Sequence, residues 1–246
     1  MTQITVSSTA STPPAPPRVA LITGGSTGIG AATAKRLLAD GYRVAVTARR
    51  EERLNRLAAD LGKPAELLLL PGDSSDEVSV GEAVEATVRQ FGRLDAVVAN
   101  AAFATVGDMD EGDPAQWRSM VLTNVLGPAL LARAALPELK RSRGRIVLVG
   151  SVAGLVYSRG NLYGATKWAV TGLAENLRLM VTGDGVGVTL VNPGRVDSAF
   201  WEPHGGLPDG PRLTSDQLAE TVAWAMRQPD GVDINTVTVR PIGAEL

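Results

Sequence analysis

The 246-residue chain contains no cysteine and a single histidine, His204. The absence of thiols excludes a disulfide scaffold, a zinc site with thiolate ligands, an iron–sulfur cluster and a cysteine nucleophile. One histidine excludes a histidine-rich metal site and disfavours a Ser–His–Asp triad. We therefore expect no resident metal and no chemistry that depends on a thiol.

The chain also lacks an excess of charge of either sign. Lys and Arg total 24 and Asp and Glu total 26, which gives a net charge of −2. No global positive field draws such a chain to nucleic acid or to an anionic membrane, so we expect neither as a partner. The opening residues lack the basic and apolar regions of a signal peptide, and the longest apolar stretch, residues 121–136, is interrupted by Asn, Gly, Pro and Arg. We expect no membrane helix and a cytoplasmic location.

Composition divides the chain into a tail and one domain. Eleven of the first seventeen residues are Ser, Thr or Pro, so residues 1–17 are predicted to form a flexible tail that buries little apolar surface. From residue 18 to residue 246 the amino-acid composition is uniform, which suits a single domain of this length.

Short aliphatic runs alternate with longer segments of helical period. Strands are predicted at residues 18–23, 43–48, 66–70, 94–99, 145–150, 186–191 and 235–239. Helices are predicted at residues 28–40, 50–61, 75–91, 114–141, 161–182 and 214–228. Most of the strands are apolar on both faces, which is typical of a parallel sheet covered on both sides. The alternation predicts an α/β, Rossmann-type doubly wound fold, with a seven-stranded parallel sheet and helices on both faces.

A glycine-rich turn joins the first strand to the first helix. The segment TGGSTGIG at residues 23–30 has small residues that let the backbone approach a pyrophosphate, and the following helix presents free N–H groups. The alternative is a tight turn that binds nothing. The turn lacks a Gly-Lys-Ser/Thr ending, which argues against a nucleotide triphosphatase.

The end of the second strand indicates the type of dinucleotide. Folds that bind NAD usually place an acid there to contact the ribose 2′-hydroxyl. This chain has Ala48 instead, followed by Arg49 and Arg50, whose guanidinium groups suit the 2′-phosphate of NADP. The pattern predicts that NADP(H) is preferred, with NAD(H) possible. The alternative is that both arginines are solvated residues at the start of a charged helix.

A serine, a tyrosine and a lysine form a candidate acid–base site. Tyr163 and Lys167 are four residues apart in a predicted helix and so share one face, and Ser151 directly follows the fifth strand. A phenol can pass a proton, a cation favours the phenolate, and a hydroxyl can hold a substrate oxygen. The alternative is an ordinary pair on a helix surface and a turn serine.

Seven stretches, in order, resemble the short-chain dehydrogenase/reductase family in its compact single-domain branch. They are TGGSTGIG at 23–30, Asp73 within LLPGDSSD, FGRLDAVVANAA at 91–102, LTNVLG at 122–127, IVLVGSVAG at 146–154, YGATK at 163–167 and NPGRVDS at 192–198. The resemblance implies an oxidoreductase that transfers a hydride between a nicotinamide cofactor and a carbonyl or secondary alcohol. The competing class is a non-catalytic Rossmann protein that senses the nicotinamide redox state, which need not keep an acid–base group.

The resemblance also implies a role for each matching residue. Tyr163 is the acid–base group, Lys167 lowers its pKa and holds the nicotinamide ribose, and Ser151 orients the substrate oxygen. Asn124 anchors the water of a proton relay, although on its own such a residue is more often a hydrogen-bonded core amide. The implied cofactor-binding residues are Gly24, Ser26, Thr27, Gly28, Ile29, Gly30, Arg49, Arg50, Asp73, Ser74, Asn100, Ala101, Tyr163, Lys167, Pro193, Gly194, Val196 and Ser198.

The substrate side is predicted from a long loop. Residues 199–212, AFWEPHGGLPDGPR, contain three prolines and three glycines, so they are expected to form no helix and to act as a lid. The predicted substrate-contacting residues are Ser151, Leu155, Tyr157, Phe200 and Trp201, with His204 at the loop surface. They predict an apolar or cyclic ketone or secondary alcohol. The alternative is that Phe200 and Trp201 pack against a neighbouring subunit.

Assembly is predicted from the resemblance together with two apolar helices. Family members of this size are usually homotetramers, with a homodimer as the other possibility. The segments 114–141 and 161–182 are apolar over much of their surface, so we expect them to pack against symmetry mates, with the last strand forming a second contact.

Overall fold

The computed structural model describes residues 16–157 and 159–244. The predicted tail of residues 1–17 lies outside the described residues except for Pro16 and Pro17, which are exposed.

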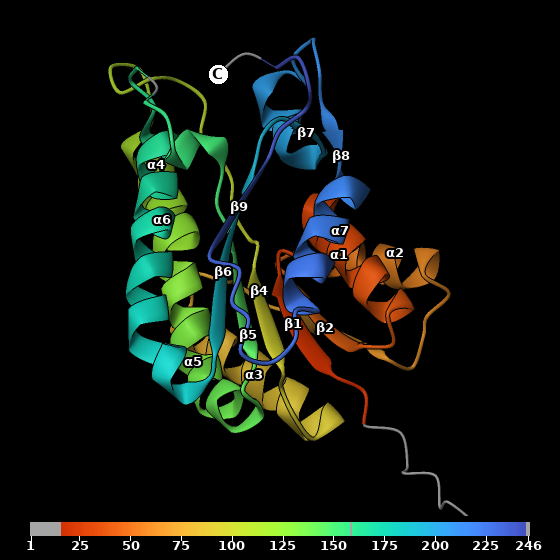
Figure 1. Cartoon of the computed structure of the whole chain (residues 1–246). Coiled ribbons are helices and arrows are strands. Elements are labelled where there is room, and N and C mark those ends of the chain that lie inside the picture. Colours follow the sequence, from red (N-terminus) through yellow and green to blue (C-terminus); the bar gives the residue numbers. More distant parts are fainter. Residues whose placement is uncertain (1–15, 158, 245–246) are drawn as a thin grey trace, which may run out of the picture.

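Seven parallel strands form the central sheet, in the order β3-β2-β1-β4-β5-β6-β9 (Figure 1). The strands are β1 Val19–Thr23, β2 Arg43–Ala48, β3 Leu67–Pro71, β4 Ala96–Ala99, β5 Arg145–Val149, β6 Gly187–Pro193 and β9 Thr236–Val239. Each begins and ends within two residues of its predicted position, so the predicted doubly wound parallel sheet is confirmed. The strand order reverses direction between β1 and β4, and a crevice opens at such a switch point, outside the carboxyl ends of the strands.

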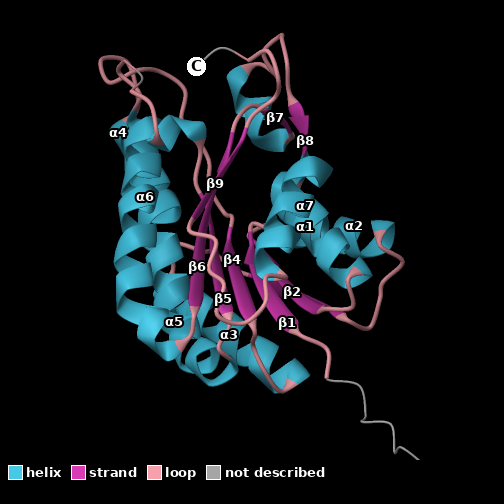
Figure 2. Cartoon of the chain, in the orientation of Figure 1, coloured by secondary structure: helices cyan, strands magenta, loops and turns pink. Residues whose placement is uncertain are grey.

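Helices cover both faces of the sheet (Figure 2). On one face lie α1 Gly28–Ala39, α2 Glu51–Asp60 and α7 Ser215–Met226, and on the other lie α3 Glu77–Phe91, α4 Pro114–Val121, α5 Gly127–Ser142 and α6 Leu162–Val181. The aliphatic strands are buried on both sides, so each layer has its own core. Leu37, Leu54 and Val222 belong to the first core, and Leu131 and Leu139 belong to the second.

Capping side chains fix where the helices near the crevice begin. The Asn161 side chain accepts a hydrogen bond from the Gly164 N–H at 3.0 Å, two residues after α6 starts. Thr214 and Gln217 form a reciprocal capping box at the start of α7. Because such caps satisfy N–H groups that have no partner within the helix, they favour one starting residue over its neighbours.

The segment predicted as one helix over residues 114–141 is divided. A π-helical turn, η1 Leu122–Leu126, separates α4 from α5. Pro128 has no backbone N–H, so the regular i→i−4 ladder cannot continue through this point. Single π turns inside α-helices are frequent at functional sites, and this one contains Asn124.

This helical run bears on the expectation that the chain has no membrane helix. By length and composition alone, Pro114–Ser142 is long and apolar enough to cross a membrane. One such helix is weak evidence of a span, because the core helices of globular proteins pass the same test. Here Leu131, Ala135 and Leu139 are buried in the core that α5 forms with the sheet.

The predicted lid contains more regular structure than expected. A 3-10 helix, η4 Ala199–His204, follows the short strand β7 Val196–Asp197, which pairs with β8 Leu213–Thr214. The Ser198 hydroxyl accepts a hydrogen bond from the Phe200 N–H at 3.4 Å and caps this turn. The expectation that residues 199–212 form no helix is therefore wrong for the first half of the loop.

Candidate active site

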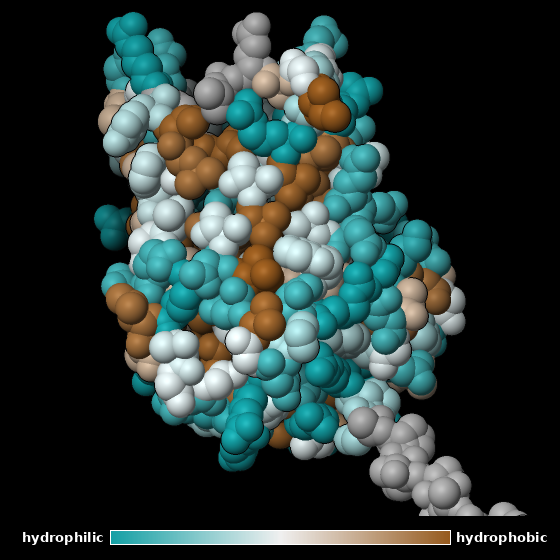
Figure 3. All heavy atoms as spheres, in the orientation of Figure 1, coloured by the Kyte–Doolittle hydropathy of each residue, from teal (hydrophilic) through white to brown (hydrophobic). Residues whose placement is uncertain are grey.

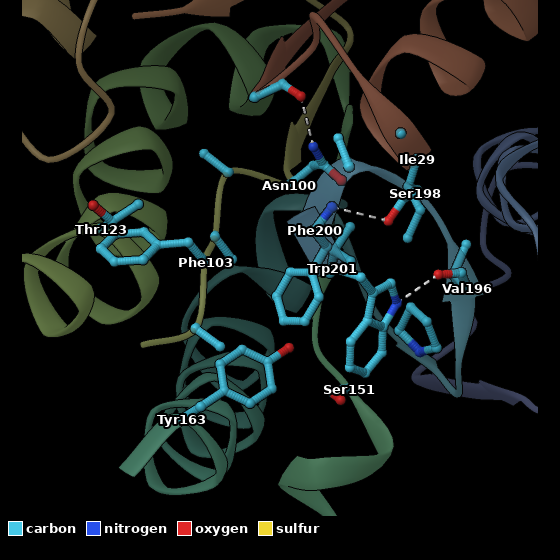
Figure 4. Close-up of a pocket in the computed structure, with 18 of the residues that line it drawn as sticks. Ile29, Asn100, Phe103, Thr123, Ser151, Tyr163, Val196, Ser198, Phe200 and Trp201 are labelled. Atoms are coloured by element: carbon cyan, nitrogen blue, oxygen red, sulfur yellow. Dashed lines mark hydrogen bonds between the residues drawn. The ribbon is translucent and has the colours of Figure 1, made fainter. Parts of the chain in front are cut away.

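A cavity of about 1030 Å³ runs along the carboxyl ends of β1 to β6 (Figure 4). It lies at the topological switch point, where open α/β sheets place their ligands. Pockets for a single drug-sized ligand are usually about 300–1000 Å³, so this cavity has room for a dinucleotide and a small substrate together.

The glycine-rich turn forms one wall of the cavity, through Gly24, Ser26, Thr27, Gly28 and Ile29. Gly24 and Gly28 have φ angles of +63° and +54°, which L side chains rarely adopt. Gly30 does not line the cavity, which corrects its predicted cofactor contact. A Cβ at Gly30 would lie 2.4 Å from the Gly24 carbonyl oxygen, so its role is to let the first turn of α1 pack against the loop.

Asn100 holds the glycine-rich turn against the end of β4. Its side-chain amide donates hydrogen bonds to the carbonyl oxygens of Thr23 and Gly24 at 3.1 and 3.0 Å. The Ala101 N–H donates to the Thr23 hydroxyl at 3.3 Å. Asn100 and Ala101 both line the cavity and also fix the shape of the turn, while their contact with a cofactor stays a prediction.

Three arginines surround the far end of the cavity. Arg49 and Arg50 line it and are solvent-exposed, and Ala48 lines it where NAD-binding folds usually carry an acid. Sequence reasoning missed the third, Arg53, which lies one helical turn beyond Arg50 and also lines the cavity. Its spacing from Arg49 and Arg50 at the start of α2 was the available signal.

Asp73 and Ser74 line the same end of the cavity, at the carboxyl end of β3. The Asp73 carboxylate accepts hydrogen bonds from the Ser75 backbone N–H and hydroxyl at 2.8 and 2.7 Å. These two bonds hold the carboxylate in one orientation beside the cavity.

Ser151, Tyr163 and Lys167 meet at the opposite end. Tyr163 and Lys167 lie on the first two turns of α6, and the Lys167 ammonium is 5.7 Å from the centre of the Tyr163 ring. Ser151 follows β5, and its hydroxyl oxygen accepts a hydrogen bond from the Ala153 N–H at 3.1 Å. In Figure 4 the Tyr163 hydroxyl points into the space that Ser151 borders.

Close packing of backbone holds these groups together. The turn η2 Val152–Gly154 lies directly on α6, where a Cβ at Gly154 would be 2.6 Å from the Lys167 carbonyl oxygen. Asn192, at the end of β6, was missed by sequence reasoning. Its side-chain oxygen accepts a hydrogen bond from the Ser151 N–H at 3.2 Å. A fully buried amide after the apolar run VGVTLV was the signal that could have found it.

Burial is the largest influence on the pKa values of Tyr163 and Lys167. It raises the pKa of Tyr163 to about 12, and the nearby Ser151 hydroxyl only partly offsets this. It lowers the pKa of Lys167 to about 8. The expected lowering of the tyrosine pKa by Lys167 is not found in the cofactor-free structure. The ammonium is directed at the Val149 carbonyl oxygen, to which it donates a hydrogen bond at 2.9 Å.

Asn124 lies behind the cavity wall as a core amide. It is 1% exposed, and its side-chain oxygen accepts a hydrogen bond from the Phe103 N–H at 3.0 Å. Its amide donates to the Phe103 carbonyl oxygen at 2.8 Å and to the Thr166 hydroxyl at 3.1 Å. The side chain thus joins the loop after β4 to α6, and its part in a proton relay stays a prediction.

The predicted lid closes the catalytic end from one side. Phe200 and Trp201 line the cavity, and the centre of the Phe200 ring lies 5.5 Å from the centre of the Tyr163 ring. The Trp201 indole N–H donates to the Val196 carbonyl oxygen at 2.9 Å, which fixes that ring (Figure 4). Pro193, Gly194, Val196 and Ser198 also line the cavity, and their contact with a cofactor stays a prediction.

The predicted opposite wall is wrong in part. Tyr157 is 94% exposed and stacks on Trp168 outside the cavity, and Leu155 is also exposed. The chain after the η2 turn leaves both side chains outside the cavity, and Val152, Ala153 and Val156 line the cavity in their place.

Further lining residues come from segments that sequence reasoning left unassigned. The loop after β4 contributes residues 102–108 and Glu111, and Arg195 and Arg240 border the cavity near Gly194. His204, expected at the surface of the lid, is half-buried and lines the cavity. Among residues 16–157 and 159–244, no group of three or more His, Asp or Glu side chains is placed to hold a metal ion.

Comparisons with known proteins agree with this geometry. A model of the short chain dehydrogenase family matches residues 18–205. An uncharacterized oxidoreductase of Staphylococcus epidermidis is 34% identical over 229 residues, covering 92% of this chain and 97% of the relative.

Two solved structures share the whole architecture. An alcohol dehydrogenase from the archaeon Thermococcus sibiricus, complexed with 5-hydroxy-NADP, superimposes with a TM-score of 0.85 at 28% identity, covering 93% of this chain and 98% of that one. A serine dehydrogenase complexed with NADP+ superimposes with a TM-score of 0.85 at 29% identity, covering 93% and 96%.

Proposed function

The chain belongs to the short-chain dehydrogenase/reductase family, and we propose that it is an NADPH-preferring enzyme that interconverts ketones and secondary alcohols. Its class as an NAD(P)-dependent oxidoreductase follows from the family. The observation that supports the finer proposal is the meeting of Ser151, Tyr163 and Lys167 under an aromatic lid, at one end of a cavity whose other end carries arginines.

The residues present fit a dinucleotide. Gly24 and Gly28 place no side chain at two positions of the glycine-rich turn, and the N-terminus of α1 attracts a pyrophosphate. Asp73 and Asn100 offer polar contacts along the cavity between this turn and β4. Gly194 and Val196 would face the nicotinamide end, next to the candidate acid–base group.

Each catalytic side chain has a separate task in the proposed reduction. Bound NADPH supplies the hydride that reduces the carbonyl carbon. Tyr163 keeps its hydroxyl protonated at neutral pH because burial raises its pKa, and it delivers that proton to the carbonyl oxygen. Ser151 accepts from Ala153, so its own hydroxyl proton is free to orient the same oxygen.

Lys167 and the lid complete this arrangement. The ammonium of Lys167 stays largely protonated at neutral pH, since its pKa is about 8, and it stabilises negative charge that develops on the tyrosine oxygen. Phe200 and Trp201 cover the site and exclude water, which strengthens these electrostatic interactions. For alcohol oxidation the same groups act in reverse, with Tyr163 as the base.

Preference for NADP(H) rests on the charges at the end of β2. Arg49, Arg50 and Arg53 can form charge-assisted hydrogen bonds with a 2′-phosphate, while Ala48 offers the ribose hydroxyls of NAD no acceptor side chain. Two similar structures were determined with NADP-type cofactors, which supports the same preference.

The substrate is proposed to be an apolar or cyclic ketone or the matching secondary alcohol. Val152, Ala153, Val156, Phe200 and Trp201 give the catalytic end a mainly apolar lining. A second candidate, a hydroxy acid or amino acid, is favoured by Arg195 and Arg240 on the same cavity and by the likeness to serine dehydrogenase. A carboxylate would pair with those arginines.

A substrate screen tests the function and separates these classes. Purified protein is mixed with NADPH and a panel of apolar, cyclic and carboxylate-bearing ketones, and oxidation of the cofactor is followed by absorbance. We expect turnover that is fastest with apolar or cyclic ketones, and faster turnover of the carboxylate-bearing members would favour the second class. Tight NADPH binding with no turnover of any member would instead support a redox-sensing role.

A homotetramer is proposed from surfaces that the single chain leaves exposed. Large apolar side chains on α4, η1 and α6 are exposed, namely Val121, Leu122, Leu126, Trp168, Leu179 and Met180. The edge strand β9 has one neighbour in the sheet. Hydrophobic residues run down the middle of the face in Figure 3, in the region where Figure 1 places β9 between the helical layers. Native mass spectrometry should give four times the 25.6 kDa chain mass, and a monomer would contradict this.

A further inference from the structure

The lid carries one polar atom whose position the proposed reduction does not explain. Within the part of the chain that the structure describes, the Nε2 atom of His204 is buried and has no hydrogen-bond partner. His204 is the only histidine of the chain and lines the same cavity as Ser151 and Tyr163. A buried polar group without a partner destabilises the folded protein, so it calls for a specific explanation.

Packing places this nitrogen close to the reacting centre. The centres of the His204 and Phe200 rings are 5.8 Å apart, and the centres of the Phe200 and Tyr163 rings are 5.5 Å apart. His204 is therefore separated from the candidate proton donor by one aromatic ring. A substrate whose carbonyl contacts Tyr163 would extend along Phe200 toward the histidine.

Neighbouring contacts keep the imidazole in this place. Trp201 packs edge-on against the imidazole, with the ring centres 6.2 Å apart. The Trp201 indole is itself held by its hydrogen bond to the Val196 carbonyl oxygen. Phe200 and Trp201 also pack against each other, with their ring centres 5.3 Å apart. Packing against Phe200 and Trp201 requires only an aromatic ring at position 204, and a phenylalanine there would pack equally well. The imidazole differs from that phenylalanine by its two ring nitrogens, and Nε2 is the one left without a partner.

We propose that His204 is a specificity-determining residue, whose Nε2 hydrogen-bonds a second oxygen atom of the substrate, a hydroxyl or a further carbonyl. The preferred substrate would then be a cyclic or otherwise apolar ketone that carries this oxygen on the side away from Tyr163. A plain ketone would leave Nε2 unpaired in the complex, as it is in the free protein. Such discrimination arises because a site built to bond a polar group penalises the analogue that lacks it. The inference rests on the proposed reduction at Tyr163.

Matched substrates measure this preference directly. Initial rates of NADPH oxidation are compared for cyclohexanone, 2-hydroxycyclohexanone and 4-hydroxycyclohexanone, together with linear ketones with and without a hydroxyl at similar distances. We expect kcat/KM to be about tenfold higher for the best hydroxylated member, the upper range for one neutral hydrogen bond. The same ratio is then measured for His204→Phe, which keeps an aromatic ring but removes both nitrogens.

The preference should fall to about one in His204→Phe, because the hydroxylated ketone loses its additional hydrogen bond and the plain ketone has none to lose. His204→Gln retains a polar atom at a similar reach and should restore part of the ratio. A structural defect would lower the rates of both substrates together and leave their ratio unchanged. Tyr157→Phe is the matched control, because it removes a polar atom from an exposed aromatic outside the cavity and should change neither rate nor ratio.

The outcomes separate the two claims. An unchanged ratio in His204→Phe, or no preference in the unmodified protein, would overturn the role of His204 while leaving the reductase intact. Failure to oxidise NADPH with any ketone would instead contradict the proposed function itself.

Discussion

Lys167 and Arg49 both bring a positive charge to one cavity, but water reaches only the second. Lys167 is 3% exposed, and its pKa falls to about 8 because the charged form is poorly solvated. Arg49 is exposed at the carboxyl end of β2. Electrostatic interactions in a buried site act over a low effective dielectric, whereas exposed charges are screened by water and salt.

This difference assigns separate tasks to the two ends. The catalytic end can perturb a proton donor strongly because Ser151, Tyr163 and Lys167 are packed against backbone and covered by the lid. The adenosine end can select between cofactors, through charges that remain hydrated in the free protein. Changes at the first end should therefore have large effects on chemistry, and changes at the second should have moderate effects on binding.

The largest effect is expected for Tyr163→Phe. The substitution keeps the aromatic ring that packs on Phe200 and removes the proton. We expect kcat for ketone reduction to fall about 10²–10⁴-fold, the usual contribution of a positioned acid–base group. NADPH affinity, measured by fluorescence titration, should stay within about twofold. A variant that retains more than about a tenth of the activity would remove Tyr163 from the mechanism.

The next largest effect concerns the buried ammonium of Lys167 in the cofactor-free protein. Its pKa is about 8 in the folded state against 10.5 in the unfolded state, so between these values the unfolded state binds more protons. Stability linked to Lys167 should therefore rise as pH increases from 8 to 10.5, and the cost of burial should be fully present below pH 8.

Denaturant unfolding of the unmodified protein and of Lys167→Met checks this sign. Their difference in unfolding free energy should shift in favour of the unmodified protein, by on the order of 2 kcal/mol across that range. Arg49→Met removes an exposed cation instead, and its curve should run parallel to that of the unmodified protein. A Lys167→Met difference that is flat with pH would mean that the ammonium is solvated.

A smaller effect is expected at the adenosine end. Combining Ala48→Asp with Arg49→Ala removes one partner of the 2′-phosphate and adds an acceptor for the ribose hydroxyls of NADH. The ratio of kcat/KM for NADPH to that for NADH should fall by about tenfold or more. Arg56→Ala is the control, since Arg56 lies close by on α2 but does not line the cavity. A preference for NADH in the unmodified protein would contradict the interpretation of β2.

The smallest expected effect is that of salt, which should weaken cofactor binding at the adenosine end more than turnover at the catalytic end. Between about 50 and 500 mM salt, the KM for NADPH should rise about two- to fivefold, because exposed charges are screened. The KM for NADH and the kcat with either cofactor should change less. A kcat that falls as steeply as affinity would show that salt reaches the catalytic end too.

Local patterns predicted the parts of this molecule that depend on short stretches of chain. Short runs rich in aliphatic residues, most of them buried on both faces, predicted all seven strands of the main sheet. Ser151 could be placed because it follows a strand that ends at the crevice, and Tyr163 and Lys167 because four residues make about one helical turn, whereas Asn100 was placed only by the family resemblance. Their roles in turnover stay predictions.

The errors lie where contacts distant in sequence decide the local geometry. Tyr157 and Leu155 left the predicted wall because the η2 turn packs against α6, which their own sequence does not reveal. Gly30 has the spacing of a cofactor contact but packs against Gly24. His204 entered the cavity because a 3-10 helix replaced the expected irregular loop and stacked its ring on Phe200.

Transfer of label from the cofactor tests the central claim most directly. The protein is incubated with a ketone that it turns over and with NADPH carrying deuterium at one or the other of the two C4 positions, and the alcohol is analysed by mass spectrometry and NMR. The account predicts that one labelled cofactor places a single deuterium on the former carbonyl carbon, that the other places none, and that Tyr163→Phe slows this transfer by at least about a hundredfold. Alcohol formed without deuterium from either cofactor, or transfer at an undiminished rate in Tyr163→Phe, would contradict it.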